Sequence, residues 1–95
     1  MDLEGARAQI NELDRQMAEL FVARMRAVEE IAAYKKANGL PVFDAAREEQ
    51  LKLRNAAFVD DGILRPYYLR FLEHTMELSR DYQKAILDGA WEETK

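Results

Sequence analysis

The fold is decided by residues 2–38, which read DLEGARAQINELDRQMAELFVARMRAVEEIAAYKKAN. No proline interrupts this stretch, and apolar residues recur every three or four positions, which is the repeat of one helix face turned toward a partner. The Lys35-Lys36 pair before Asn38-Gly39 is typical of a helix exit, with cations at the negative end of the helix dipole. We therefore predict one helix from about Asp2 to Asn38, whose apolar face comprises Leu3, Ala6, Ile10, Leu13, Met17, Leu20, Arg24, Val28, Ile31 and Lys35.

Two members of this face, Arg24 and Lys35, are cationic. A buried charge is costly unless it is paired, so we expect the face to open onto carboxylates of the protein or of a ligand. Long basic side chains can instead lay their stems on apolar surface and keep the charge in water, and this alternative stays open for each residue alone. The two residues lie about three turns apart on one side of the helix, so both could approach one small ligand.

The remaining sequence predicts two shorter helices. Asp44 is a suitable N-cap for a helix reaching about Phe58, and a turn follows at residues 60–62. Pro66 marks the first turn of the last helix, which should end near residues 88–89. Because strand signals are absent, we predict an all-α domain covering residues 1–95. The expected inner face of the last helix comprises Leu64, Tyr68, Phe71, Thr75, Leu78, Tyr82 and Ile86.

The length of the first helix implies a partner. A helix of about 36 residues is about 54 Å long, whereas a compact chain of 95 residues has a radius of gyration of about 12 Å. One subunit cannot bury such a helix, so we predict an intertwined homodimer in which the long helices pack on each other and on both pairs of short helices. An antiparallel helical dimer with no catalytic activity would explain this pattern equally well.

Composition excludes several classes of function. The formal net charge of −4 argues against a general surface for nucleic acid or anionic membranes. The sequence has no cysteine, so disulfides and thiolate metal sites are excluded. The start MDLEGARAQI has no basic segment followed by an apolar run, and no stretch approaches the length of a membrane span. We expect a cytoplasmic protein.

Two pairs of polar residues have helical spacing. Asp44 and Glu48 are i and i+4 at the start of the second helix, with Arg47 on the adjoining side. Ser79 and Gln83 form a second such pair within an otherwise apolar face of the last helix. The alternatives are that Asp44 acts only as a cap, that Ser79 bonds its own backbone, and that Gln83 is solvated.

Arg7 lies seventeen residues before Arg24, which is about 25 Å along the helix. It cannot reach the same ligand within one subunit, although its symmetry mate in an antiparallel dimer can. Taken alone, Arg7 is a surface residue.

Together these residues resemble the active-site pattern of the all-helical chorismate mutases. Two segments are most similar to that family, Ala6-Arg7-x-x-Ile10-x-x-Leu13-Asp14 and Pro41-Val42-x-Asp44-x-x-Arg47-Glu48, and the resemblance covers nearly the whole chain. It implies an intertwined homodimer with two equivalent sites, each completed by Arg7 of the other subunit. The implied reaction is the Claisen rearrangement of chorismate to prephenate, a step of aromatic amino acid biosynthesis that is unimolecular and needs no nucleophile, metal or cofactor.

The resemblance also implies a role for each residue. Arg24 and Arg7 of the other subunit would bind the two substrate carboxylates, with Arg47 and Ser79 in support. Lys35 and Gln83 would donate hydrogen bonds to the ether oxygen as its bond breaks. Glu48 would accept from the ring hydroxyl, and Asp44 would contribute mainly through its backbone amide. His74 is expected to be structural or exposed.

Two competing functions remain. An isochorismate pyruvate lyase of the same fold would use much of the same cationic pocket, but that enzyme lacks an acid at the position of Glu48. A non-catalytic helical dimerisation module would leave the inward position of Lys35 and Gln83 unexplained.

Overall fold

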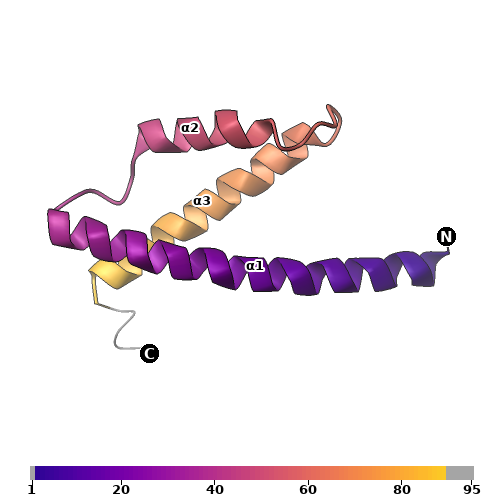
Figure 1. Cartoon of the computed structure of the whole chain (residues 1–95), viewed down its shortest axis with the longest axis horizontal. Coiled ribbons are helices and arrows are strands. Elements are labelled where there is room, and N and C mark those ends of the chain that lie inside the picture. Colours follow the sequence, from indigo (N-terminus) through magenta and orange to yellow (C-terminus); the bar gives the residue numbers. More distant parts are fainter. Residues whose placement is uncertain (1, 90–95) are drawn as a thin grey trace.

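The chain folds into three α-helices, as seen in a computed structural model that describes residues 2–89 (Figure 1). Helix α1 spans Leu3–Asn38, α2 spans Ala45–Ala56 and α3 spans Arg65–Leu87. No strand occurs between residues 2 and 89, so the predicted all-α class is confirmed. Met1 and residues 90–95, including Trp91, lie outside the described part.

Both ends of α1 are capped, and the exit at Asn38-Gly39 was predicted. The Asp2 carboxylate accepts a hydrogen bond of 2.7 Å from the Gly5 amide, which satisfies one of the free N–H groups of the first turn. At the other end, Gly39 adopts the left-handed conformation with φ of 64°, and its amide donates to the Lys35 carbonyl. Glycine suits this position because it has no Cβ to clash. The predicted bounds of the long helix are confirmed.

Helix α2 ends at Ala56, two residues before the predicted Phe58. The Arg65 guanidinium explains the early end, because its Nε donates to the carbonyl oxygens of Ala56 at 3.1 Å and Val59 at 2.9 Å. These bonds hold the chain in a turn beyond α2 instead of another helical turn. Pro66 then lies in the first turn of α3, as predicted.

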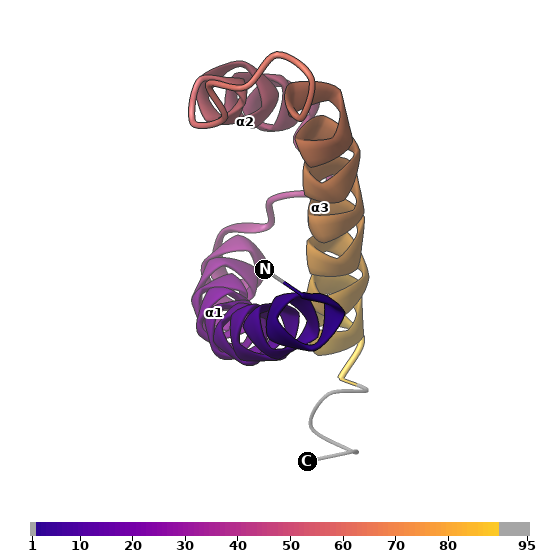
Figure 2. The ribbon, with the colours of Figure 1, turned by 90° about the vertical axis from the view of Figure 1, so that its right-hand side faces the viewer.

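Helix α3 packs against both other helices, whereas α1 and α2 lie apart on the same side of it (Figure 2). The N-terminal half of α1 extends well beyond the other two helices (Figure 1). The molecule measures 52 × 32 × 14 Å, so its thinnest dimension is little more than one helix diameter. None of the helices between residues 2 and 89 is long and apolar enough to cross a membrane.

The apolar core of the described chain is small. It lies where α1 crosses α3, and its buried side chains are Val28, Ala32, Leu72 and Met76. The predicted inner face of α3 is confirmed only in part, since Tyr68, Thr75, Tyr82 and Ile86 are partly buried whereas Leu64, Phe71 and Leu78 are exposed. The face turned inward also carries Leu72, Met76, Ser79 and Gln83.

Most of the apolar face of α1 is uncovered. Its N-terminal members Leu3, Ile10, Leu13, Met17 and Leu20 are 49 to 69% exposed. The radius of gyration of 16.4 Å exceeds the value of about 12 Å expected for a compact chain of this length. One subunit does not bury its long helix, as the length argument predicted.

The small core predicts a contrast between two leucines. Leu72 is 5% exposed and Leu53 is 77% exposed. Leu72→Ala should lower the free energy of unfolding by about 2–5 kcal/mol, because it leaves a cavity where α1 crosses α3. The matched change Leu53→Ala should alter it by less than about 0.5 kcal/mol. Equal losses in urea denaturation of the two variants would contradict the location of the core.

Candidate functional site

A cleft of about 540 Å³ opens between the three helices. Among the described residues, five cations line it, which are Arg24, Lys35, Arg47, Arg54 and Arg80. The acids on its wall are Asp44 and Glu48. The lining therefore has a positive balance within a protein whose net charge is −4. Such a local field favours a small ligand with more than one negative charge.

Arg24 of α1 reaches across the cleft to Ser79 of α3. Its Nη1 donates to the Ser79 hydroxyl oxygen, and this hydroxyl in turn donates to the Thr75 carbonyl at 3.0 Å. Ser79 therefore bonds its own helix backbone and supports Arg24 at the same time. Burial lowers the pKa of the Arg24 guanidinium, although nearby Tyr68 acts in the opposite direction. An arginine stays protonated at neutral pH despite such a decrease.

Lys35 lines the cleft beside the connection between α1 and α2. Its ammonium donates to the Val42 carbonyl at 2.8 Å and to the Gln83 side-chain oxygen at 3.0 Å. Because that oxygen accepts from Lys35, the NH₂ group of Gln83 is its donor for a ligand. Ser79 and Gln83 are each only 7% exposed, which decides against a solvated Gln83.

Arg24 and Lys35 share one electrostatic feature. Their protein partners are a hydroxyl, an amide oxygen and a backbone carbonyl, all of which are neutral. Within residues 2–89, no ion pair involves either cation. Two half-buried positive charges thus have no anionic partner among residues 2–89, which leaves that place to a ligand.

The start of α2 supplies the opposite wall. The Asp44 carboxylate is the N-cap of this helix and accepts from the Arg47 amide at 3.0 Å. Arg47 is exposed at the wall of the cleft. Glu48 is paired with Arg80, whose Nη1 lies 2.6 Å from each carboxylate oxygen.

The structure brings together all but one of the predicted site residues. The cleft is lined by Arg24, Lys35, Asp44, Arg47, Glu48, Ser79 and Gln83. Arg7 is exposed on the uncovered half of α1 and is not part of this lining. Its distance from the site agrees with the prediction that it cannot reach a ligand held by its own subunit.

Sequence reasoning missed Arg54, Arg80 and the Val42 carbonyl. The signal for Arg80 was its position directly after Ser79 and one turn before Gln83, which places it beside the polar part of α3. Its partner Glu48 is thirty-two positions away in the sequence, so the ion pair follows only from the packing of α2 on α3.

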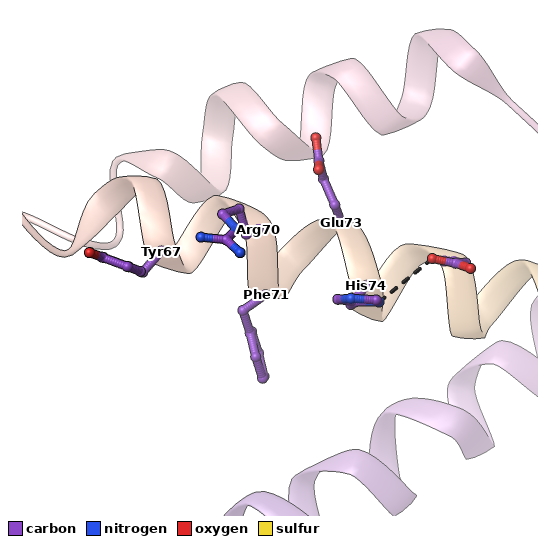
Figure 3. A pocket seen from close by; sticks show the side chains of 6 residues that line it. Tyr67, Arg70, Phe71, Glu73 and His74 are labelled. Carbon is purple, nitrogen blue, oxygen red and sulfur yellow. Dashed lines mark ion pairs between the residues drawn. The ribbon is translucent and has the colours of Figure 1, made fainter.

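A second hollow of about 570 Å³ lies along the outer part of α3 (Figure 3). Its side chains come from one helix, and Figure 3 shows Phe71 and Glu73 pointing in opposite directions. His74 is exposed, with its Nδ1 atom 3.6 Å from a Glu77 carboxylate oxygen, so of the two expectations for this histidine the exposed one holds. Because polar groups from different helices do not converge here, the cleft between the three helices is the better candidate site.

The described residues were also compared with the ligand set that a metal ion requires. Between residues 2 and 89, no three His, Asp or Glu side chains come close enough to hold one. The cleft offers charged and neutral hydrogen-bond donors on facing walls, which suits the binding and polarisation of an anionic ligand.

Comparison with known proteins adds one finding. A family model described as Chorismate mutase type II matches residues 6–84. This range contains α2, most of α1 and α3, and every predicted site residue. No curated protein and no solved structure matches the chain significantly.

Proposed function

The chain belongs to the chorismate mutase type II family, and from this membership we propose that it catalyses the Claisen rearrangement of chorismate to prephenate. In this reaction the ether C–O bond breaks while a C–C bond forms between the enolpyruvyl arm and the ring. No group leaves and no electron is taken up. The protein has to hold the arm over the ring and stabilise the negative charge that develops on the ether oxygen.

The proposal rests above all on the neutral partners of Arg24 and Lys35. A dianionic substrate supplies the carboxylates that these cations do not find in the described part of the chain. Arg24 suits a carboxylate because its planar fork can donate to both oxygens, and Ser79 fixes the position of that fork. Arg47 lies close enough to support the same anion from α2.

Lys35 and Gln83 are the donors that we assign to the ether oxygen. Their contact of 3.0 Å places an ammonium and an amide side by side at the wall of the cleft. Both are held before substrate arrives, so little reorganisation is needed as the charge develops. Glu48 then accepts from the ring hydroxyl, and Asp44 contributes its backbone amide at the start of α2.

The second carboxylate requires Arg7 of the partner subunit. The uncovered apolar face of α1 supports a homodimer, since an exposed surface of this length is costly in water. In an antiparallel arrangement, the N-terminal half of each long helix lies over the cleft of the other subunit. Arg7 of the partner subunit then closes the site.

A product assay tests the reaction. The purified chain should convert chorismate to prephenate at full rate in the presence of a chelator, and it should release little pyruvate from isochorismate. Preferential formation of salicylate from isochorismate would contradict the assignment in favour of a lyase. A folded chain that consumes neither substrate would point to a non-catalytic module.

Gln83→Glu tests contact with the ether oxygen. A carboxyl group donates a hydrogen bond only when it is protonated, and the Lys35 ammonium favours its ionised form. Turnover near neutral pH should fall about 100-fold and should rise as the pH is lowered. Gln83→Met, which has no donor at any pH, should stay slow throughout. A wild-type pH profile with activity retained in Gln83→Glu would exclude the contact.

Refolded mixtures test the shared site. Arg7→Ala and Arg24→Ala homodimers should each be nearly inactive, because every site lacks one carboxylate ligand. A mixed dimer has one site with both changes and one site with neither. Random pairing makes about half the dimers mixed, so an equal mixture should recover about a quarter of wild-type activity.

The control for this experiment is each variant refolded alone. Circular dichroism should confirm refolding, and native mass spectrometry should confirm mixed dimers. If mixed dimers form and activity stays at the level of the two parents, Arg7 does not act across the interface.

A further inference from the structure

Arg80 and Glu48 form the ion pair that joins α3 to the first turn of α2. Arg80 Nη1 donates to Glu48 Oε1 and Oε2, each at 2.6 Å. The two side chains are 27% and 19% exposed, so water screens this pair less than the other ion pairs of the described chain. Charge-assisted bonds of this length belong to the stronger class of hydrogen bonds.

Phe43 also contacts the Arg80 guanidinium. The guanidinium carbon of Arg80 lies 5.5 Å from the centre of the Phe43 ring, which is the geometry of a cation–π contact. Phe43 belongs to the connection between α1 and α2, one residue before the cap Asp44. Arg80 of α3 therefore contacts both an aromatic ring of the α1–α2 connection and a carboxylate of α2. These contacts join the three segments at the wall of the cleft.

This arrangement differs from that of the cations on α1. Arg24 and Lys35 bond neutral groups, whereas the charge of Arg80 is compensated by Glu48. Arg80 thus adds little to the attraction of an anion. Its evident effect is on Glu48, whose carboxylate keeps free lone pairs after accepting one bond on each oxygen.

We infer that Arg80, held by Phe43, is a positioning residue that fixes the Glu48 carboxylate to accept a hydrogen bond from the substrate's ring hydroxyl. This inference rests on the proposed function. A glutamate side chain that is ordered before binding does not lose its rotamer freedom when the substrate arrives. The ion pair also keeps an unpaired carboxylate from repelling a dianionic substrate.

If Arg80 has a purely structural role, a different result is expected. If Arg80 only clamps α2 to α3, its loss weakens the site for every substrate alike. If Arg80 acts through Glu48, its loss affects a substrate with the ring hydroxyl more than an otherwise identical dianion without it. The two roles are separated by the kcat/KM of the substrate with the hydroxyl divided by the kcat/KM of the dianion without it. General charge effects affect both values and cancel in this ratio.

The experiment compares chorismate with a chorismate analogue that lacks the ring hydroxyl. In Arg80→Gln the ratio of kcat/KM values should fall about tenfold, as expected when a long carboxylate side chain must be ordered on binding. Arg80→Lys, which keeps an ion-pair donor, should restore most of the ratio. In a Glu48→Gln background, Arg80→Gln should change the ratio by less than about twofold. The carboxylate through which Arg80 acts is already absent there, so the effects of the two changes do not add.

Lys84→Gln is the matched control, since Lys84 is an exposed cation one turn further along α3 and does not line the cleft. It should leave the ratio unchanged. If Arg80→Gln fails to fold, Phe43→Leu supplies the test, because it removes the ring contact and should lower the ratio at least about twofold.

The outcomes separate the two proposals. A wild-type chain that does not consume chorismate contradicts the proposed function together with this inference. An active wild-type chain whose ratio is unchanged in the folded Arg80 or Phe43 variant contradicts the inference alone.

Discussion

The site depends on two hydrogen bonds by which cations of the long helix contact the last helix. Arg24 donates to Ser79 and Lys35 donates to Gln83, so the half-buried cations of α1 are held by neutral acceptors on α3. Neutral acceptors satisfy the hydrogen bonds of a cation without cancelling its charge. The fold therefore positions two positive charges and leaves them available, and this explains why the wall of the cleft attracts an anion in a protein of negative net charge.

The shape of the subunit follows from the same constraint. Helix α3 has to cross α1 closely enough for Ser79 and Gln83 to meet the cations, and the small core of Val28, Ala32, Leu72 and Met76 lies at this crossing. Few side chains are buried outside this crossing, so the subunit is thin and the apolar N-terminal half of α1 stays uncovered. The proposed dimer uses that surface both to complete the hydrophobic packing and to bring Arg7 of the partner subunit to the site.

Much of this arrangement could be predicted from the sequence. The long helix followed from an uninterrupted repeat with a clear C-terminal exit, and Arg24 and Lys35 stood out because a charge on an apolar face is costly unless it is paired. On α3 the inward position of Ser79 and Gln83 was predicted, but that of Leu72 and Met76 was not, because Leu64-Phe71-Leu78 and Leu72-Met76-Ser79-Gln83 both fit a helical repeat. Apolar periodicity favoured the first set, whereas the hydrogen bonds to α1 turn the second set inward. Arg80 was missed although Ser79 and Gln83 lie close to it on the helix, because its partner Glu48 is distant in sequence.

The central claim is that the cleft between the three helices binds the reacting substrate. A crystal structure with an oxabicyclic dicarboxylate that mimics the transition state tests it most directly. The account predicts the ligand in this cleft, with Lys35 Nζ and Gln83 Nε2 each about 2.7–3.2 Å from the ether oxygen and with Arg24 and Arg7 of the partner subunit on the two carboxylates. A ligand bound in the outer hollow of α3, or held in the cleft without contact between the ether oxygen and Lys35 or Gln83, would contradict it.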